Sequence, residues 1–387
     1  MFGKQLAVLA IVLIGSSVFQ LIAADIVTTS LIKSVLSGSD TENVIFSPYL
    51  VKESLMQLYL GAEGNTSDEI EETLQLSKDL SKDNIINIII HNIVKFKRER
   101  YGTFEKASRT YVAKNTLVDL RYSQKYEELF NTSVAEVNFG SSINKKFKIS
   151  DWIMDKTSVK LTKAINELTN ETQIIQIGAM SFHGKWKEPF QVSDTKLASF
   201  YIPQKTGDFY TTKISTMSRL GQCQYNFIEK LKAYSIEIPY AHPQLSMIIL
   251  QPKAMDGVHQ MIQNLNDLTL NDLVPKDVVS NFRILLPKFK IGITLKLKEA
   301  LKNFGIKDLF ENANLSGMTG PTKYLVNEIL HKVQIELDEG AQKDKIDMAD
   351  FGSISKQFIA AVNHPFVFLV KDKKTVYIAG RINKLGK

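Results

Sequence analysis

The chain has 387 residues, of which 44% are apolar and 23% are charged, with a formal net charge of +7 and a pI near 9.1. This composition excludes a disordered chain and supplies enough apolar side chains for one large core. The positive net charge favours binding of anionic partners only weakly, and its main effect is to keep the protein soluble. Because Cys223 is the single cysteine, an intrachain disulfide is excluded and stability must come from packing.

The first 24 residues have the pattern of a secretory leader, in which Lys4 precedes the apolar run Leu6 to Ile14 and small residues follow. Cleavage after Ser17 and cleavage after Ala24 both remain open, because both residues are small enough. The run is too short to cross a membrane. We therefore expect a secreted, extracellular protein. Residues 25–387 should form one domain, since no Pro/Gly/Ser-rich linker, repeat or low-complexity stretch interrupts them.

Two further features matter for an exported chain. Cys223 could be a reactive thiol or could pair between chains, although a small apolar role in the interior is the more common one. Four Asn-x-Ser/Thr sequons are glycosylation candidates, and because so short a motif arises by chance we expect some to be unused. They are Asn65, Asn131, Asn170 and Asn314.

Helix signals come early in the chain. Ser47-Pro48 is typical of an N-cap followed by proline at the first helical position, and it predicts a helix that closes near Gly61. Thr66 and Glu69 have the spacing of a capping box for a second helix. Apolar residues at helical spacing from Ile85 to Phe96 predict a third.

The predicted third helix ends in a basic cluster made of Lys95, Lys97, Arg98 and Arg100. This cluster is a candidate polyanion patch for heparin-like sulfated glycans. A solvated helix end, whose cations suit the C-terminal dipole, is the commoner explanation of such a run. We therefore expect at most weak, salt-sensitive binding.

Short motifs follow one another along most of the chain. They are NVIFSP at 43–48, LYLGAEGNT at 58–66, QIIQIGAMSFHGKW at 173–186, FRILLPKFKI at 282–291, HKVQIELDEGA at 331–341, HPFVFLV at 364–370 and GRI at 380–382. Each is weak alone, but their order and spacing resemble the serpins, the serine-protease-inhibitor family. The resemblance implies an α+β, single-domain serpin fold with three β-sheets, about eight or nine helices and an exposed reactive-centre loop.

A long polar interval separates the strand-like segment that starts at His331 from the buried run that starts at Phe366. By resemblance, residues of about 340–362 form the reactive loop, which a protease cuts and which then inserts into a sheet as a new strand. Counting fourteen residues from Gly340 places the reactive bond at Ile354–Ser355. The expected partner is an extracellular serine protease, as inhibitor target or as the enzyme that cleaves the loop.

The hinge after Gly340 departs from the family pattern, in which a run of small residues lets alternate side chains enter the interior. One face of the hinge holds Ala341, Lys343, Lys345 and Asp347, and the other holds Gln342, Asp344, Ile346 and Met348. The family register buries the first face with three charges. A shift by one residue, suggested by the shortened spacing before Gly340, buries only Asp344. Because an unpaired buried ion costs several kcal/mol, efficient trapping is not expected.

Three residues align with the family's sheet-opening region: Ser47, Gly178 and His331. Where this chain has Gly178, the family has an Asn that hydrogen-bonds the histidine aligned with His331. The missing amide leaves His331 in need of another partner or of water, and we expect sheet opening to be altered.

Motifs for catalysis or metal binding are absent from the sequence. The six histidines form no His-x-x-x-His pair, and one cysteine does not make a structural zinc site. There is no P-loop, Gly-x-Gly-x-x-Gly or Gly-x-Ser-x-Gly motif, although a Ser/His/Asp triad depends on geometry that sequence leaves open. We predict no catalytic residue, cofactor, metal or enzyme activity, no nucleic-acid or membrane partner, and a monomer.

Two functions remain. The charged hinge predicts a secreted serpin-family protein that is non-inhibitory or a poor suicide-substrate inhibitor, acting by binding, as a carrier, regulator or protease substrate. The alternative is a functional inhibitor of an extracellular serine protease through cleavage near Ile354–Ser355. The composition of the hinge discriminates between the two.

Overall fold

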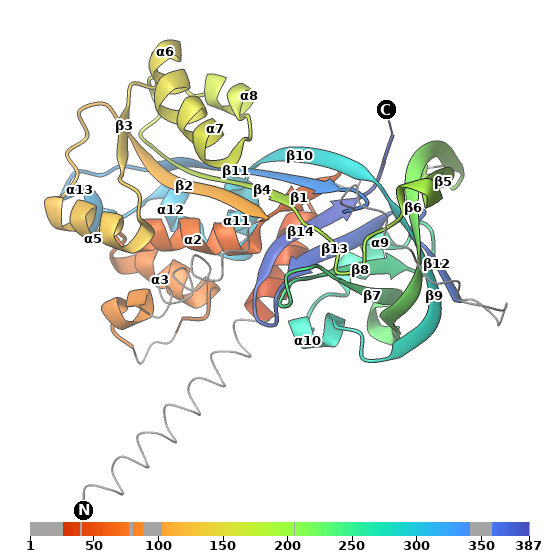
Figure 1. The fold of residues 1–387 in the computed structure, drawn as a ribbon. Helices are drawn as coiled ribbons and strands as arrows, with labels where there is room; N and C mark the ends of the chain where they lie inside the picture. The colour runs from red at the N-terminus through yellow and green to blue at the C-terminus, as the bar shows by residue number, and fades with distance from the viewer. Residues whose placement is uncertain are drawn as a thin grey trace, which may run out of the picture.

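The computed structural model describes residues 26–38, 41–76, 80–87, 103–204, 206–340 and 358–386, which form two β-sheets with most helices around the smaller one (Figure 1). The helices are α2 (Pro48–Tyr59), α3 (Gly64–Thr73), α5 (Leu120–Phe130), α6 (Ser142–Lys145), α7 (Asp151–Thr157), α8 (Thr162–Asn166), α9 (Val258–Gln263), α10 (Leu270–Leu273), α11 (Lys298–Phe304), α12 (Asp308–Glu311) and α13 (Ser316–Thr319). Residues 26–36 and 82–87 are also helical, and a π-helical turn, Lys146–Ser150, joins α6 to α7.

The strands are β1 (Val44–Phe46), β2 (Phe104–Ala113), β3 (Ala135–Val137), β4 (Ile174–His183), β5 (Lys196–Pro203), β6 (Phe209–Ile228), β7 (Ala233–Pro239), β8 (Ser246–Pro252), β9 (Val278–Pro287), β10 (Phe289–Lys296), β11 (Val326–Leu337), β12 (Phe358–Ala361), β13 (Phe366–Lys371) and β14 (Val376–Ile382). The predicted α+β class is confirmed. The described part of the chain has eleven named α-helices rather than eight or nine, because α6, α10, α12 and α13 are single turns of four residues that leave little periodic signal.

The five-stranded sheet has the strand order β10-β11-β4-β2-β3. β10 is antiparallel to β11, whereas β11 is parallel to β4, with His331 opposite Gly178. β4 is antiparallel to β2, with Gly178 opposite Ser108. A row of three residues therefore crosses the middle of the sheet, one on each of its three central strands.

The nine-stranded sheet has the order β1-β14-β13-β8-β7-β6-β9-β12, with β5 paired to β6 beside this path. β6 is 20 residues long; its first part pairs with β5 and its last residues pair with β7. The resemblance implied three sheets, but the described residues form two. The reason is that β6 continues without a break from one ladder to the other and joins sheets that were expected to be separate.

The start of α2 agrees with the predicted cap. Ser47 is extended, and its Oγ accepts a hydrogen bond from the backbone N–H of Leu50 at 3.0 Å, with Pro48 at the first helical position. The helix ends at Tyr59, close to Gly61 as expected. Gly61 is needed for a close approach, since a Cβ there would lie 2.6 Å from the Cβ of Met318.

The predicted capping box at Thr66 and Glu69 is wrong. Both residues lie inside α3, which has no side-chain cap. Thr66 instead donates from its hydroxyl to the carboxylate of Asp308, and Glu69 accepts from the backbone N–H groups of Lys307 and Asp308 at 2.7 Å each. The two side chains therefore bind the start of α12, a contact across more than 230 residues that a local pattern does not contain.

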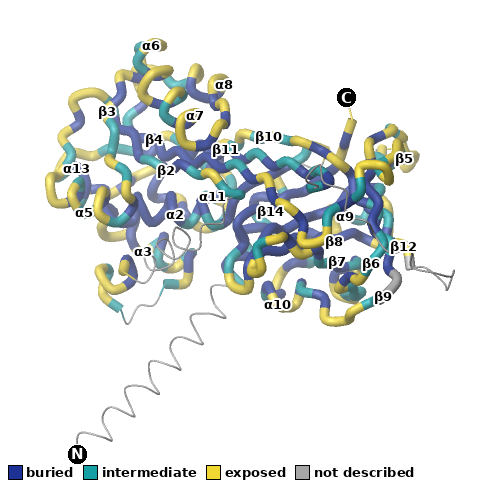
Figure 2. The backbone as a smooth tube through the Cα atoms, in the orientation of Figure 1, coloured by how far each residue is buried: buried dark blue, intermediate teal, exposed yellow. Residues whose placement is uncertain are grey.

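One apolar core joins both halves of the chain. Its largest cluster of buried side chains extends from Val27 to Ala379, so the segments before and after residue 180 are packed together. Figure 2 shows the burial concentrated along the strands and α2. α2 packs on β2 and β4 of one sheet and on β14 of the other, and therefore lies between the sheets. Within the described residues, none of the helices has the length and apolar character needed to span a membrane.

Candidate functional site

The chain leaves the five-stranded sheet just after β11, where neighbouring side chains hold Asp338 and Gly340. The indole N–H of Trp186 donates to the carbonyl of Asp338 at 2.8 Å, and the backbone N–H of Gly340 donates to the Asp338 carboxylate at 2.9 Å. Trp186 is itself stacked on Tyr240, with ring centroids 4.4 Å apart. Gly340 has a φ of +62°, and a Cβ there would lie 2.9 Å from Trp186 Cδ1. Position 340 therefore requires glycine for two reasons: its left-handed backbone conformation and the close approach of the Trp186 indole.

Glu339 anchors the same turn. Its carboxylate accepts from Lys288 Nζ at 2.6 Å and from the hydroxyl of Thr195 at 2.8 Å, and its carbonyl accepts from the backbone N–H of Phe190 at 2.9 Å. Burial raises the pKa of Glu339, but the hydrogen bonds from Lys288 and Thr195 outweigh burial and hold the pKa below its ordinary value. A charged, buried anchor thus fixes the point at which the predicted loop begins.

The loop itself lies outside the described residues. This holds for the predicted hinge residues Ala341, Lys343, Lys345 and Asp347 and for the predicted bond Ile354–Ser355, which remain predictions. The chain resumes as β12, which pairs in parallel with Phe282–Leu285 of β9 and occupies the last part of the interval predicted as loop. The loop therefore connects the end of β11 in one sheet with an end strand of the other sheet.

The family resemblance implies that the loop enters the smaller sheet beside β11, on its β4 side. Because the loop leaves the C-terminal end of β11, a return along the sheet runs antiparallel to β11. One edge of β11 is already paired with β10, and the other is paired in parallel with β4. A strand inserted between β11 and β4 would be antiparallel to both, and it would replace one parallel ladder with two antiparallel ones. We name this boundary the β4–β11 seam.

The two faces of the β4–β11 seam differ near the loop. The face toward the core is apolar and at most 2% exposed; its residues are Met180, Phe182, Val333 and Ile335. The opposite face is polar and partly exposed; its residues are Ser181, Lys332, Gln334 and Glu336. An inserted strand would therefore place every second side chain in an apolar environment.

The structure brings the three residues of the predicted sheet-opening region together. Nε2 of His331 accepts a hydrogen bond from the backbone N–H of Ser47 at 2.9 Å, and Gly178 lies opposite His331 across the seam. Nδ1 of His331 is buried and has no hydrogen-bond partner among the described residues. Burial lowers the pKa of His331 from 6.5 to about 3, so the ring is neutral at physiological pH.

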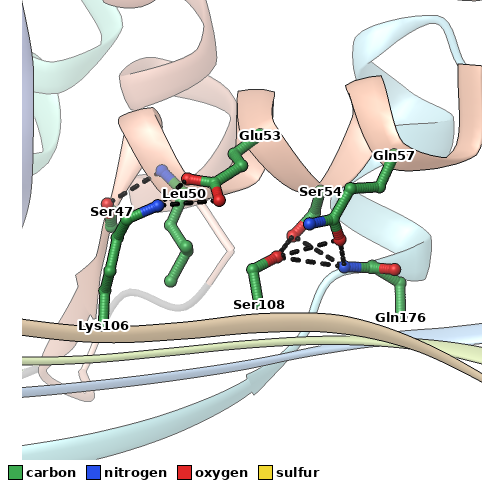
Figure 3. Close-up of polar contacts among 8 residues, drawn as sticks. All are labelled: Ser47, Leu50, Glu53, Ser54, Gln57, Lys106, Ser108 and Gln176. Atoms are coloured by element: carbon green, nitrogen blue, oxygen red, sulfur yellow. Dashed lines mark hydrogen bonds and ion pairs between the residues drawn. The ribbon is translucent and has the colours of Figure 1, made fainter. Parts of the chain in front are cut away.

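A buried polar cluster between α2 and strands β2 and β4 was missed by the sequence analysis (Figure 3). Oε1 of Gln57 accepts from Nε2 of Gln176 at 2.5 Å and from the hydroxyl of Ser108 at 3.1 Å. Oε1 of Gln176 accepts from the hydroxyl of Thr110 at 2.6 Å, and its Nε2 also reaches Ser54. All five side chains are at most 7% exposed. One signal was present in the sequence, since Gln176 interrupts an apolar run that otherwise predicts a buried strand.

An ion pair lies beside this cluster. Nζ of Lys106 on β2 binds the carboxylate of Glu53 on α2 at 2.7 Å, and both groups are largely buried (Figure 3). α2 is thus linked to β2 by charge as well as by hydrogen bonds.

The remaining predicted site residues are placed as follows. The four sequon residues Asn65, Asn131, Asn170 and Asn314 are all exposed, as a glycan requires, and their occupancy remains a prediction. Cys223 is buried, and burial raises the pKa of its thiol to about 11. The basic cluster Lys95, Lys97, Arg98 and Arg100 lies outside the described residues. Among the residues that are described, no group of three or more His, Cys, Asp or Glu side chains could hold a metal ion.

The fold defines a class of protein in which a long segment joins the end of β11 in the smaller sheet to the end strand β12 of the larger sheet. A family model described as "Serpin (serine protease inhibitor)" matches residues 23–385. The chain therefore belongs to the serpin family, as its sequence motifs predicted.

Relatives and a solved structure agree with this assignment. Iripin-1 of Ixodes ricinus is 29% identical over 368 residues, covering 91% of each chain. "Serine protease inhibitor 42Dd" of Drosophila melanogaster is 27% identical over 365 residues, covering 92% of this chain and 95% of that relative. The crystal structure of uncleaved ovalbumin matches with a TM-score of 0.80 at 20% identity, covering 94% of this chain and all of that chain, which shows the shared fold.

Proposed function

We propose that this chain is a secreted serpin that traps proteases poorly or not at all, and that it acts by binding, as a carrier, a regulator or a protease substrate. The observation that carries the proposal is a mismatch. The hinge after Gly340 contains Lys343, Asp344, Lys345 and Asp347, whereas the core face of the β4–β11 seam is apolar. A loop that enters this seam must place charge against that face.

The cost of burying the hinge charges is large enough to prevent trapping of the protease rather than only to delay it. In one register Lys343, Lys345 and Asp347 face the core, and in the other Asp344 does. An unpaired buried ion costs several kcal/mol even after relaxation. About 1.4 kcal/mol in an activation free energy changes a rate tenfold. An insertion barrier raised by a few kcal/mol therefore slows insertion by a factor of hundreds or more, while hydrolysis of the cleaved intermediate continues.

A second function is supported by a different observation. Relatives of similar length carry inhibitor names, including the Drosophila protein named as a serine protease inhibitor. An inhibitor of an extracellular serine protease, cleaved near Ile354–Ser355, is therefore the alternative. It requires the hinge charges to be neutralised or paired during insertion.

The setting of the proposal is extracellular. Its supports are the leader-like first 24 residues and four exposed sequon asparagines. The partner is a serine protease, as target or as loop-cleaving enzyme, with at most weak binding of sulfated glycans at the Lys95–Arg100 cluster. We assign the chain no catalytic role of its own.

The proposal is tested by cutting the loop and measuring stability. Limited proteolysis between Met348 and Gln357 should leave the cut loop outside the sheet, so the melting temperature should rise little. A variant with alanine at Lys343, Asp344, Lys345 and Asp347 should insert its loop when cut and gain thermal stability, because the burial cost is gone.

An SDS gel with trypsin-like, chymotrypsin-like and elastase-like proteases provides the deciding readout. The unmodified chain should be cleaved without forming a complex. A denaturant-stable covalent complex at near one-to-one stoichiometry would overturn the proposal and establish the inhibitor instead.

A further inference from the structure

A polar pocket lies at the edge of the five-stranded sheet that ends in β3. Its volume is about 440 Å³, and its walls come from β2, β3 and the helical segment that starts at α6 (Figure 1). Small-molecule sites in proteins have volumes of about 300–1,000 Å³. The π-helical turn Lys146–Ser150 contributes Lys148 to the wall, and such turns are rare and frequently occur at functional sites. The size of the pocket and its unusual backbone both make it a candidate ligand site.

Arg109 of β2 lines this pocket as a cation without a counter-ion. Its Nε donates to the hydroxyl of Thr132 at 3.0 Å, and its guanidinium lies over the ring of Trp152, 3.9 Å from the ring centroid. These two contacts hold the guanidinium in place. No carboxylate among the described residues forms an ion pair with Arg109, although the side chain is partly buried. A guanidinium fixed in this way is prepared to bind an oxyanion through two parallel hydrogen bonds.

The other charged side chains of the wall leave the pocket positive. Lys114 and Lys148 also line it, and neither forms an ion pair within the part of the chain that the structure describes. Glu136 is the one acidic residue of the wall. Three cations against one carboxylate give the lining a formal charge of +2. A ligand with two negative charges therefore matches the pocket.

The uncharged side chains of the wall are arranged as hydrogen-bond donors. Oδ1 of Asn144 accepts from the backbone N–H of Asn138 at 2.9 Å, and Oδ1 of Asn138 accepts from the backbone N–H of Gly140 at 3.1 Å. Oγ of Ser141 accepts from the backbone N–H of Asn144 at 3.2 Å. Because these bonds occupy the oxygens, the Nδ2 groups of both asparagines and the hydroxyl proton of Ser141 remain to donate. Charge and hydrogen bonding thus both favour an anion.

We propose that this pocket binds a small organic phosphate, a phosphate monoester whose dianion is held by Arg109, Lys114 and Lys148. A phosphate monoester carries close to two negative charges at neutral pH, which matches the formal charge of the lining. The cavity is larger than a phosphate group, so the organic part of the ligand has room beside it. Glu136 and the two asparagines suit hydroxyl groups there, such as those of a sugar. The pocket includes neither the loop nor the seam, so the inference does not depend on the proposed function.

Isothermal titration calorimetry of the whole chain with glucose 6-phosphate tests the site, at constant ionic strength because salt screens exposed charges. Arg109→Gln should weaken binding by about tenfold or more, since charge-assisted hydrogen bonds are lost. Lys148→Gln should weaken it several-fold, and it decides the matter if the Arg109 variant does not fold, because Lys148 is exposed. Glu136→Gln should instead tighten binding by about threefold, because a repulsive charge is removed.

Lys160→Gln is the matched control. Lys160 is an exposed cation just after α7 that does not line the pocket, so its replacement should leave the affinity unchanged. Binding at Arg109 should also change the fluorescence of Trp152, on which the guanidinium lies, and Trp152→Phe should remove that change. An equal loss of affinity in the Lys160 variant would overturn the site in favour of general attraction to a basic protein. Affinity that is unaltered by both Arg109→Gln and Lys148→Gln would also overturn it.

Two further ligands identify the chemistry of the anion. Inorganic phosphate should bind more weakly than glucose 6-phosphate, because it leaves most of the cavity empty. Glucose 6-sulfate should also bind more weakly, because it carries a single negative charge. Equal affinity for either of them overturns the organic dianion, and no binding of glucose 6-phosphate or inorganic phosphate at millimolar concentration overturns the site. The proposed function fails on a separate result, the covalent complex on the SDS gel.

Discussion

Leu50 fills the space that a side chain at position 178 would need. A Cβ on Gly178 would lie 3.0 Å from Cγ of Leu50 and 3.4 Å from Nδ1 of His331, and Leu50 is fully buried. Gly178 on β4 and Leu50 on α2 therefore pack directly against each other. The amide that the family has at this position could not be added to this chain without moving Leu50.

Restoring that amide alone should destabilise the protein. We expect Gly178→Asn to lower the free energy of unfolding by about 1–3 kcal/mol, because it overpacks a closed site. Leu50→Ala should also lower the free energy of unfolding. The double variant should lose less stability than the two single variants added together, because Leu50→Ala vacates space for the new side chain and the new amide oxygen can accept a hydrogen bond from Nδ1–H of His331. Urea unfolding of the four proteins measures the coupling. Strictly additive costs would contradict the shared arrangement.

The buried imidazole of His331 should make the protein acid-sensitive. Its folded pKa of about 3 lies below the ordinary value of 6.5, so the unfolded chain takes up the proton first as the pH falls. Stability from this group is complete above pH 6.5 and is lost progressively below it. His331→Gln should reduce the loss by about 1 kcal/mol per pH unit between about pH 6 and pH 4.

Urea midpoints at successive pH values check this prediction. Some acid sensitivity should persist in the variant, because burial also lowers the pKa of His364. An identical pH dependence in both proteins would show that His331 does not carry the effect.

The anchor at Glu339 should hold the start of the loop. Glu339→Gln removes the charge that binds Lys288, and we expect it to lower the free energy of unfolding by about 1 kcal/mol at neutral pH and to speed cleavage of the loop. Because the folded pKa of Glu339 lies below its ordinary value, the difference from the unaltered protein should shrink in acid as the carboxyl group is protonated.

Glu336 on β11, three residues before Glu339, provides a matched control. Glu336 pairs with Lys290 at 2.7 Å, but both groups are more exposed. Glu336→Gln should therefore cost about 0.5 kcal/mol or less and leave loop cleavage unchanged. Equal effects of the two variants would argue against a special role for Glu339.

Cys223 should be inert in the folded protein. Its thiol is buried with its pKa raised to about 11 by burial, so little thiolate is present at neutral pH. A disulfide-exchange reagent should react with it only after unfolding in urea. Rapid reaction of the native protein, or a disulfide-linked dimer on a non-reducing gel, would support the reactive or pairing roles instead.

The parts of the fold that the sequence predicts are those set by neighbours along the chain. The cap at Ser47 is such a case, since it involves residues three apart, and it was found. Thr66 has an equally good local pattern, but Asp308 binds its hydroxyl and the pattern is overridden. The continuity of β6 was also not predictable, because the joining of two ladders depends on partners elsewhere in the chain.

The candidate functional site likewise contains residues that the sequence predicts and contacts that it does not. Ser47, Gly178 and His331 were predicted through family motifs to lie in one region, but the hydrogen bond from the backbone N–H of Ser47 to His331 was not predicted. Gln57 lies outside the recognised motifs and Gln176 lies inside one, but they bond across 119 residues, so only the assembled fold brings them together. Trp186 was within a recognised motif, yet its bond to Asp338 spans 152 residues and was not visible.

The pairing of β1 with β14 sets a condition on how the protein is made. Val44 and its neighbours in β1 find their ladder partners at Ala379 to Arg381, and β13 and β14 separate β1 from β8 in the larger sheet. During synthesis, β1 therefore stays without its ladder partner until residues 379–381 have left the ribosome. Closing so long a loop is slow, so this part of the larger sheet forms late, and the apolar side chains of β1 are prone to aggregation until then.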